Sequence, residues 1–147
     1  MFGLFKNEKI KTCDLVGKCI HSQIIKVLEE KETIFTKGDN SKELIFFHTY
    51  LSGLLFAAAH YKNINVDFTL DNKYKKYIID GINPDFWPYF LKAEDLISLE
   101  ISPTFDVESL QEEAKNAGHY DATMTNIADV LNLYRFLTGK ELLKYNE

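Results

Sequence analysis

The chain has 147 residues, 46% of them hydrophobic and 14% aromatic, and its formal net charge at pH 7 is −5. This apolar content is enough to pack one core, so the length predicts a single domain over residues 1–147. The negative charge argues against direct binding to nucleic acid, because the acidic middle of the chain would repel phosphate groups.

The cysteines and the N-terminus indicate the cellular compartment. Cys13 and Cys19 lie six residues apart on one expected helix, on different faces and too far apart for a disulfide bond. The start of the chain, MFGLFKNEK, becomes polar after five residues and has no long apolar region with a small-residue cleavage site, so it does not resemble a signal peptide. Reduced thiols and no signal peptide predict a cytoplasmic protein.

The first expected helix covers residues 12–31, in which apolar side chains recur at helical spacing. A turn is expected over residues 37–40, which contain a glycine and side chains that can bond their own backbone. A second helix is expected over residues 41–62, with Asn40 and Glu43 forming a capping-box pattern at its start.

This second helix is the element around which the others are expected to pack. Residues 44–61 carry no formal charge and are apolar on every face, and such a helix must be buried. Gly53 and Ala57, four residues apart, predict a face on which a neighbouring helix packs closely. The segment falls short of the about 20 apolar residues of a membrane span and includes His48 and His60, so a buried helix without a membrane is the preferred interpretation.

The next segments mix helical and strand patterns. Residues 64–70 and 97–102 alternate apolar and polar side chains, which is typical of strands, although helical spacing competes over residues 89–101. A minor two-stranded ribbon is therefore the alternative to an entirely helical fold. Between these segments, a helical face over residues 70–78 is expected to end at Asp80 and Gly81.

Prolines divide the chain after that helix. Residues 83–88, Asn-Pro-Asp-Phe-Trp-Pro, cannot form a helix interior, because each proline removes a hydrogen-bond donor, so they predict a rigid aromatic connection. Asp106 is then expected to cap a helix that Gly118 ends.

A strongly amphipathic helix is expected over residues 124–137, ended by Gly139. Thr138 and Glu141 form the pattern of a capping box for a last short helix. The sequence as a whole predicts an all-α fold, a single compact domain of six or seven helices around the buried central helix.

The histidines and cysteines match no known catalytic or metal-binding spacing. No histidine has a glutamate three residues before it, and neither His-Glu-x-x-His nor a zinc spacing is present. His119, Tyr120 and Asp121 form a compact polar cluster, but a helix stop at Gly118 and a cap at Asp121 explain it without catalysis. The sequence therefore predicts no metal, no cofactor and no catalytic residue.

The negative charge is concentrated in residues 80–113, which hold nine carboxylates against Lys92 alone, a net charge of −8. A solvated face is the simplest interpretation of such a run. However, Trp87 and Tyr89 lie among these carboxylates in a proline-braced turn. Aromatic anchors surrounded by charge of one sign are typical of a protein-binding surface, and the partner would be basic.

The predicted function is a non-catalytic acidic protein that masks a basic protein partner, as an inhibitor or an immunity protein neutralises a nuclease toxin. The aromatic rings would anchor the partner, and the carboxylates would steer its approach and pair with its basic groups. The predicted partner-binding residues are Asp85, Trp87, Tyr89, Glu94, Asp95, Asp106 and Glu108. The alternative is a small-molecule-binding or enzymatic domain with a core pocket lined by His48, Tyr50 and His60.

Overall fold

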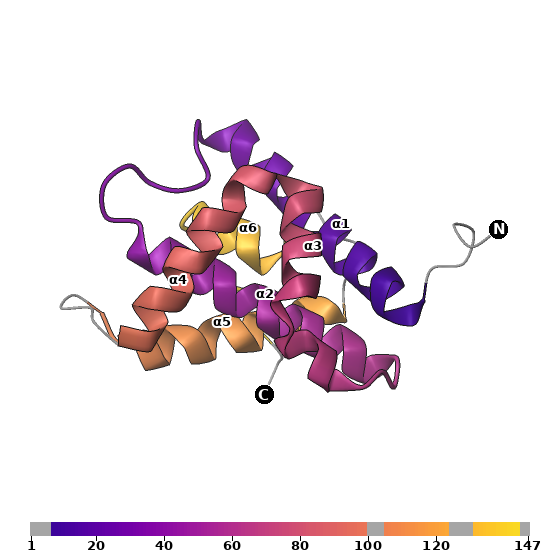
Figure 1. Ribbon diagram of the computed structural model, residues 1–147. Coiled ribbons are helices and arrows are strands. Elements are labelled where there is room, and N and C mark those ends of the chain that lie inside the picture. The colour runs from indigo at the N-terminus through magenta and orange to yellow at the C-terminus, as the bar shows by residue number, and fades with distance from the viewer. Residues whose placement is uncertain (1–6, 100–104, 124–130, 145–147) are drawn as a thin grey trace.

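The computed structural model describes residues 7–99, 105–123 and 131–144, and these are all-helical, without a strand (Figure 1). Two short 3₁₀ helices precede α3 and α4 and are η2 (Val66–Leu70) and η3 (Pro84–Phe86). The α-helices of the described residues are α1 (Glu8–Glu30), α2 (Ser41–Tyr61), α3 (Asn72–Ile82), α4 (Trp87–Leu99), α5 (Val107–Ala122) and α6 (Asn132–Leu137). The all-α prediction is confirmed.

Helix α2 is the centre of the domain, as its composition predicted. It contacts α1, α4, α5, α6 and η2, and twelve of its residues are buried, whereas Phe56 and His60 lie on a face that is exposed. By length and composition α2 could cross a membrane, but 67% of its apolar window is buried inside the protein. The other helices therefore supply the apolar surroundings that such a helix requires.

Helices α2 and α5 cross at two glycines. A Cβ atom on Gly53 would lie 2.7 Å from the carbonyl oxygen of Lys115, and one on Gly118 would lie 2.6 Å from the carbonyl oxygen of Tyr50. The close packing predicted at Gly53 is present. The prediction that Gly118 ends its helix is wrong, because this glycine lies inside α5 and α5 continues to Ala122.

Helices α3 and α4 form a pair on one side of α2. Helix α3 packs against α1, helix α4 packs against α2, and the two are joined through η3 at the top of Figure 1. Pro84 and Pro88 fit because they occupy the first turns of η3 and α4, where a helix does not need their missing N–H groups.

The alternative of a two-stranded ribbon is not found, because the described residues contain no strand. Residues 66–70 form η2, which begins where the Asn65 side chain accepts a hydrogen bond of 2.9 Å from the Asp67 N–H group. The alternating apolar side chains of this segment do not share one buried face, since Phe68 is 4% exposed but Leu70 is 78% exposed. Residues 97–99 are the last turn of α4, and residues 100–102 lie outside the described residues.

The starts of two helices differ from expectation. Helix α1 begins at Glu8, because the Asn7 side chain caps it by accepting a hydrogen bond of 2.8 Å from the Ile10 N–H group. Helix α2 begins as predicted but without the capping box, since the Glu43 carboxylate accepts from the Thr36 N–H group at 2.7 Å instead.

The C-terminal region also departs from its prediction. Residues 138–144 form no last helix, and the Thr138 hydroxyl donates back to the Tyr134 carbonyl oxygen at 2.8 Å. Gly139, with a φ angle of 75°, follows the end of α6 as predicted. Of the helix expected over residues 124–137, residues 124–130 lie outside the described residues.

Candidate functional site

The predicted partner-binding residues lie on η3, on α4 and at the start of α5. Asp85, Tyr89, Asp95 and Glu108 are exposed, whereas Trp87 and Glu94 are half-buried. The set therefore follows the length of α4 and continues onto the next helix.

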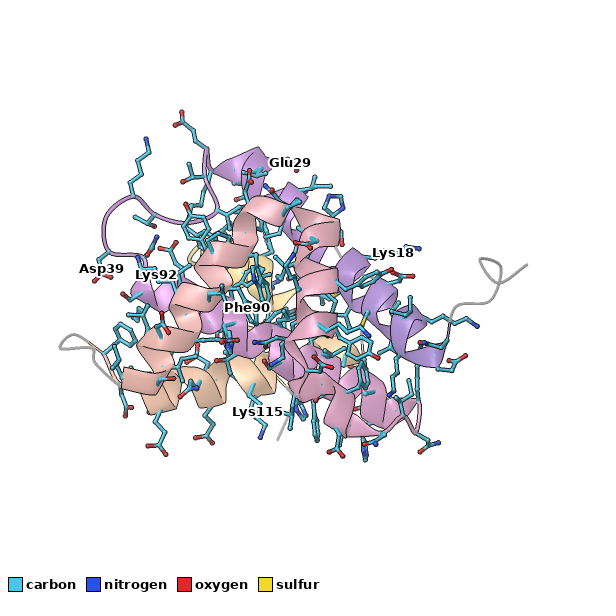
Figure 2. The ribbon with its side chains drawn as sticks, in the orientation of Figure 1. Lys18, Glu29, Asp39, Phe90, Lys92 and Lys115 are labelled. Carbon is cyan, nitrogen blue, oxygen red and sulfur yellow. The ribbon has the colours of Figure 1, made fainter. Side chains whose placement is uncertain are left out.

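The outer face of α4 also exposes apolar side chains. Leu91, Asp95 and Leu99 are spaced four residues apart and so share one face. Leu91 is 41% exposed, Leu99 is 64% exposed, and Tyr89 on the same helix is 41% exposed. Lys92, the one cation of α4, lies near Asp39, whose pKa is lowered mainly by the backbone hydrogen bond from Ser41 and in small part by Lys92 (Figure 2).

Two residues of the predicted set have roles inside the fold. The Asp106 carboxylate caps α5 by accepting from the Ser109 N–H group at 3.2 Å and from the Ser109 hydroxyl at 2.9 Å, and these bonds lower its pKa. The Trp87 ring stacks on the Phe90 ring with their centroids 5.0 Å apart. Both side chains are thus occupied before any partner binds.

Glu94 faces inward, toward α2. Its Oε1 atom lies 3.6 Å from Nε2 of His48, whose ring also contacts the Phe90 ring at 4.3 Å. Lys75 of α3, which is 7% exposed, lies close enough to interact electrostatically with both His48 and Glu94. Burial lowers the pKa of His48 to about 4, with a further lowering by Lys75, so the imidazole is neutral at pH 7.

The alternative pocket residues lie in three different surroundings. His48 is half-buried beneath α4, and His60 is exposed near the end of α2. Tyr50 is fully buried and bonded to Gln23 and Asp121. A ligand in contact with all three would have to displace helices, so this geometry does not favour the pocket.

Tyr50 belongs to a buried polar network that sequence reasoning missed. Its hydroxyl donates to Oδ2 of Asp121 at 2.6 Å and accepts from Nε2 of Gln23 at 2.9 Å. Asn132 donates to the same carboxylate twice, from its backbone N–H group at 2.8 Å and from its side chain at 2.9 Å. The Tyr134 N–H group donates to Oε1 of Gln23 at 3.0 Å. The network joins α1, α2, α5 and α6.

Asp121 was expected to cap a helix in a loop, and that prediction is wrong. It lies in the last turn of α5 and is fully buried, which raises its pKa to about 6 although its hydrogen bonds oppose the shift. Helical spacing from Ala114 through Ala117 to Asp121 could have placed it on the buried face. Since Gln23, Tyr50, Asp121 and Asn132 are inaccessible to a substrate, the network is structural.

A groove of about 670 Å³ runs between α5 and the C-terminal segment. Its α5 wall is one helical face, since its residues recur at intervals of three and four: Ser109, Glu112, Glu113, Asn116 and Tyr120. Leu142 and Leu143 line the opposite wall. Asn132 holds that wall in place, because its side chain accepts from the Leu143 N–H group at 2.6 Å and donates to the Leu143 carbonyl oxygen at 3.0 Å.

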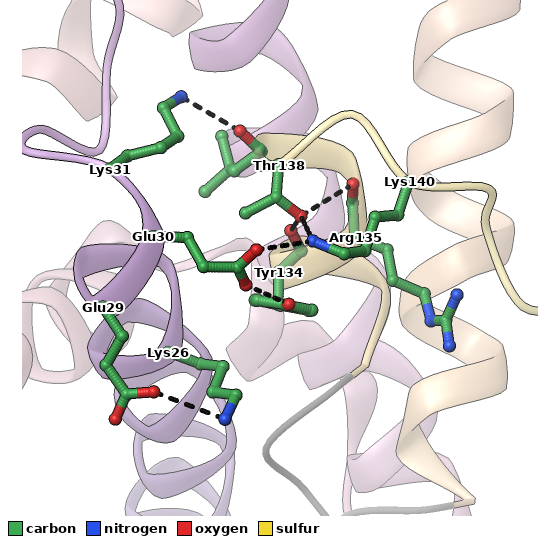
Figure 3. A network of polar contacts seen from close by, with 9 residues as sticks. Lys26, Glu29, Glu30, Lys31, Tyr134, Arg135, Thr138 and Lys140 are labelled. Carbon is green, nitrogen blue, oxygen red and sulfur yellow. Dashed lines mark hydrogen bonds and ion pairs between the residues drawn. The ribbon is translucent and has the colours of Figure 1, made fainter.

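Carboxylates outside the acidic segment are mostly bonded to neighbouring groups. Figure 3 shows one such group, in which Glu30 accepts from Lys140 at 2.8 Å and from the Tyr134 hydroxyl, and Glu29 pairs with Lys26 at 3.3 Å. Within the acidic segment itself, Asp80 pairs with Lys76 at 2.7 Å.

The exposed carboxylates of α4, η3 and α5 differ. Within the described parts of the chain they make no side-chain hydrogen bond and no ion pair, and they are Asp85, Asp95, Glu108, Glu112 and Glu113. Five unpaired charges of one sign remain available to an external cation.

The described residues contain no group of three or more metal-ligating side chains of the kind that could hold an ion. Both cysteines are buried. Burial raises the pKa of Cys13 to about 11 and that of Cys19 to about 12, with smaller contributions from Asp14 and Asp121. These thiols are therefore protonated at pH 7 and weakly nucleophilic.

Comparisons with known proteins gave no match. No family model matches the chain, and neither a curated protein nor a solved structure does.

Proposed function

We propose that this chain is a non-catalytic, protein-binding protein that masks a basic partner protein, in the manner of an inhibitor or an immunity protein that neutralises a nuclease toxin. The observation that carries the proposal is the set of five exposed carboxylates on η3, α4 and α5 whose side chains have no bonding partner in the described residues. Unpaired surface charges of one sign speed the encounter with an oppositely charged partner.

Exposed apolar side chains on α4 support the same proposal. Tyr89, Leu91 and Leu99 provide area that a partner could bury, and Asp95 lies between two of them on one face. Protein interfaces combine apolar or aromatic anchors with surrounding polar groups in this way.

The structure changes which residues we assign to binding. Trp87, Glu94 and Asp106 contact Phe90, His48 and Ser109 within the fold, so their substitution would affect stability as well as binding. We assign anchoring to Tyr89, Leu91 and Leu99, and we assign steering and pairing to Asp85, Asp95, Glu108, Glu112 and Glu113.

A charge-reversal experiment tests the proposal. The triple variant Asp85→Lys, Asp95→Lys and Glu108→Lys changes the net charge from −5 to +1 without removing a described internal bond. The matched control reverses three exposed carboxylates elsewhere, Glu32, Asp67 and Glu141, and changes the net charge equally.

The measurement is the association rate with a purified basic protein that co-purifies with the full chain, at about 0.05 M and about 0.3 M salt. We expect the acidic-surface variant to associate about tenfold or more slowly at low salt, and the control to keep most of the wild-type rate. Equal rates for wild type and the acidic-surface variant, or no binding by wild type, would contradict the proposal.

A further inference from the structure

The groove between α5 and the C-terminal segment has the features of a peptide-binding site. One wall presents Glu112 and Glu113, both exposed and without a bonding partner in the described residues. The other wall presents the half-buried side chains of Leu142 and Leu143. A ligand in the groove therefore meets negative charge on one side and an apolar surface on the other.

The charge of the groove favours a cationic occupant. Among the described residues that line the groove, Lys144 is the one lysine or arginine, and two glutamates oppose it. Glu108 extends the negative charge along α5 toward its start. His119 also lines the groove, but burial lowers its pKa, with smaller contributions from Lys115 and His60, so it adds no charge at pH 7.

The length of the groove suits a short extended segment. The lining residues on α5 run from Ser109 to Tyr120, which is about 16 Å at about 1.5 Å per residue of helix. An extended chain rises about 3.3 Å per residue, so about five residues would span it.

Hydrogen bonds to the rest of the fold hold the apolar wall of the groove in place. Asn132 bonds both backbone groups of Leu143, and Asp121 fixes Asn132 through two further bonds. The buried network beneath α5 thus fixes the backbone of Leu143 before a partner arrives, which lowers the cost of binding.

Resting on the proposed function, we infer that this groove receives an extended basic segment of the partner, about five residues long, with an apolar residue between lysines or arginines. The apolar side chain packs on Leu142 and Leu143 while the flanking cations pair with Glu112 and Glu113.

Three peptides with blocked ends test the inference by NMR titration of the ¹⁵N-labelled full chain at low salt: Lys-Lys-Leu-Lys-Lys, Lys-Lys-Gly-Lys-Lys and Glu-Glu-Leu-Glu-Glu. We expect the first to shift amide signals of residues 109–120 and 142–144 with saturation. The glycine peptide should bind about threefold or more weakly, and the acidic peptide should produce no saturable shift.

The double variant Glu112→Gln and Glu113→Gln keeps the side-chain shape and removes two charges. This double variant should bind the leucine peptide with an affinity about threefold or more below that of wild type. The control Glu32→Gln and Asp67→Asn removes two exposed charges elsewhere and should leave the affinity close to that of wild type.

Three outcomes would overturn the groove assignment: equal binding of the leucine and glycine peptides, equal weakening by both double variants, or shifts confined to residues 85–99. Absence of any shift with the lysine peptides would overturn it too. Each of these leaves the charge-reversal result with the whole partner unaffected. The proposed function fails separately, if reversing Asp85, Asp95 and Glu108 does not slow association.

Discussion

The Tyr50 hydroxyl donates a hydrogen bond of 2.6 Å to Oδ2 of Asp121, and both side chains are completely buried. The bond crosses the contact between α2 and α5 close to Gly53 and Gly118, where the two backbones nearly touch. A buried carboxylate in such a position lowers the stability of the folded state unless the donors around it are well placed to hydrogen-bond it. The packing of α5 on the central helix therefore depends on this pair.

Tyr50→Phe should destabilise the protein by about 1 to 3 kcal/mol, because it removes one donor from the buried Asp121 and one of the acceptors of Gln23. Tyr77→Phe is the matched control, since the Tyr77 hydroxyl donates to Asp14 at 2.7 Å on the surface and its loss should cost less than about 1 kcal/mol. Denaturant unfolding measures both. Equal losses would mean that the buried bond is no more important than the exposed one.

Gly118→Ala should destabilise the protein by about 3 kcal/mol or more, because the added Cβ would meet backbone atoms of α2 at 2.6 Å, and backbone cannot move aside as a flexible side chain can. Gly81→Ala is the control. Gly81 lies in α3 with nothing within 4 Å of the added atom, so alanine should be neutral or stabilising by up to about 1 kcal/mol. Melting temperatures that fall equally for both variants would contradict the close crossing.

Asp121 should make the protein more stable as the pH falls from about 6 to about 4. Burial raises its pKa from the ordinary 3.8 to about 6, so in this range the folded state binds a proton that the unfolded state does not. The contribution is about 2 to 3 kcal/mol in favour of the protonated form, and it is lost as the pH rises through 6. Asp121→Asn should remove this slope. The check is the free energy of unfolding of both proteins between pH 4 and pH 8.

His48 should act in the opposite direction. Burial lowers its pKa from 6.5 to about 4, so its stabilising contribution is present above pH 6.5 and decreases as the pH falls toward 4. As the pH falls from 6.5 to about 4, the free energy of unfolding of His48→Leu should therefore decrease less than that of wild type. The difference between the two decreases should reach up to about 3 kcal/mol. Its side chain faces Glu94 and Phe90 of α4 and Lys75 of α3. Parallel pH profiles for the two proteins would contradict the assigned burial.

Glu94→Lys should destabilise the protein by about 1 to 2 kcal/mol, because it replaces the negative charge beside the buried Lys75 with a positive charge of the same sign as Lys75. Asp95→Lys changes the charge equally at the next position, where the side chain is exposed and unpaired in the described residues, and should leave stability within about 0.5 kcal/mol. Thermal melts of the two variants distinguish an inward-facing Glu94 from a second surface carboxylate.

The amino-acid sequence by itself determined the helical class and the central position of α2. Both are local properties: apolar side chains on every face of residues 44–61 leave a helix no stable place except the interior. The close approach at Gly53 followed in the same way from small residues four positions apart. The alternation in residues 64–70 was misleading, because so short a segment fits a strand and a 3₁₀ turn equally, and the Asn65 cap decides between them.

The tertiary structure alone decided which polar residues face solvent. Gly118 and Asp121 fit a helix stop and a cap by local pattern, yet α2 lies against that turn of α5 and makes them a crossing point and a buried acceptor. Glu94 and Asp95 are adjacent carboxylates that sequence cannot tell apart, and the position of α2 turns one inward and leaves the other exposed. The physical reason is that a helix fixes which side chains share a face, whereas burial and pairing depend on which other helix covers that face.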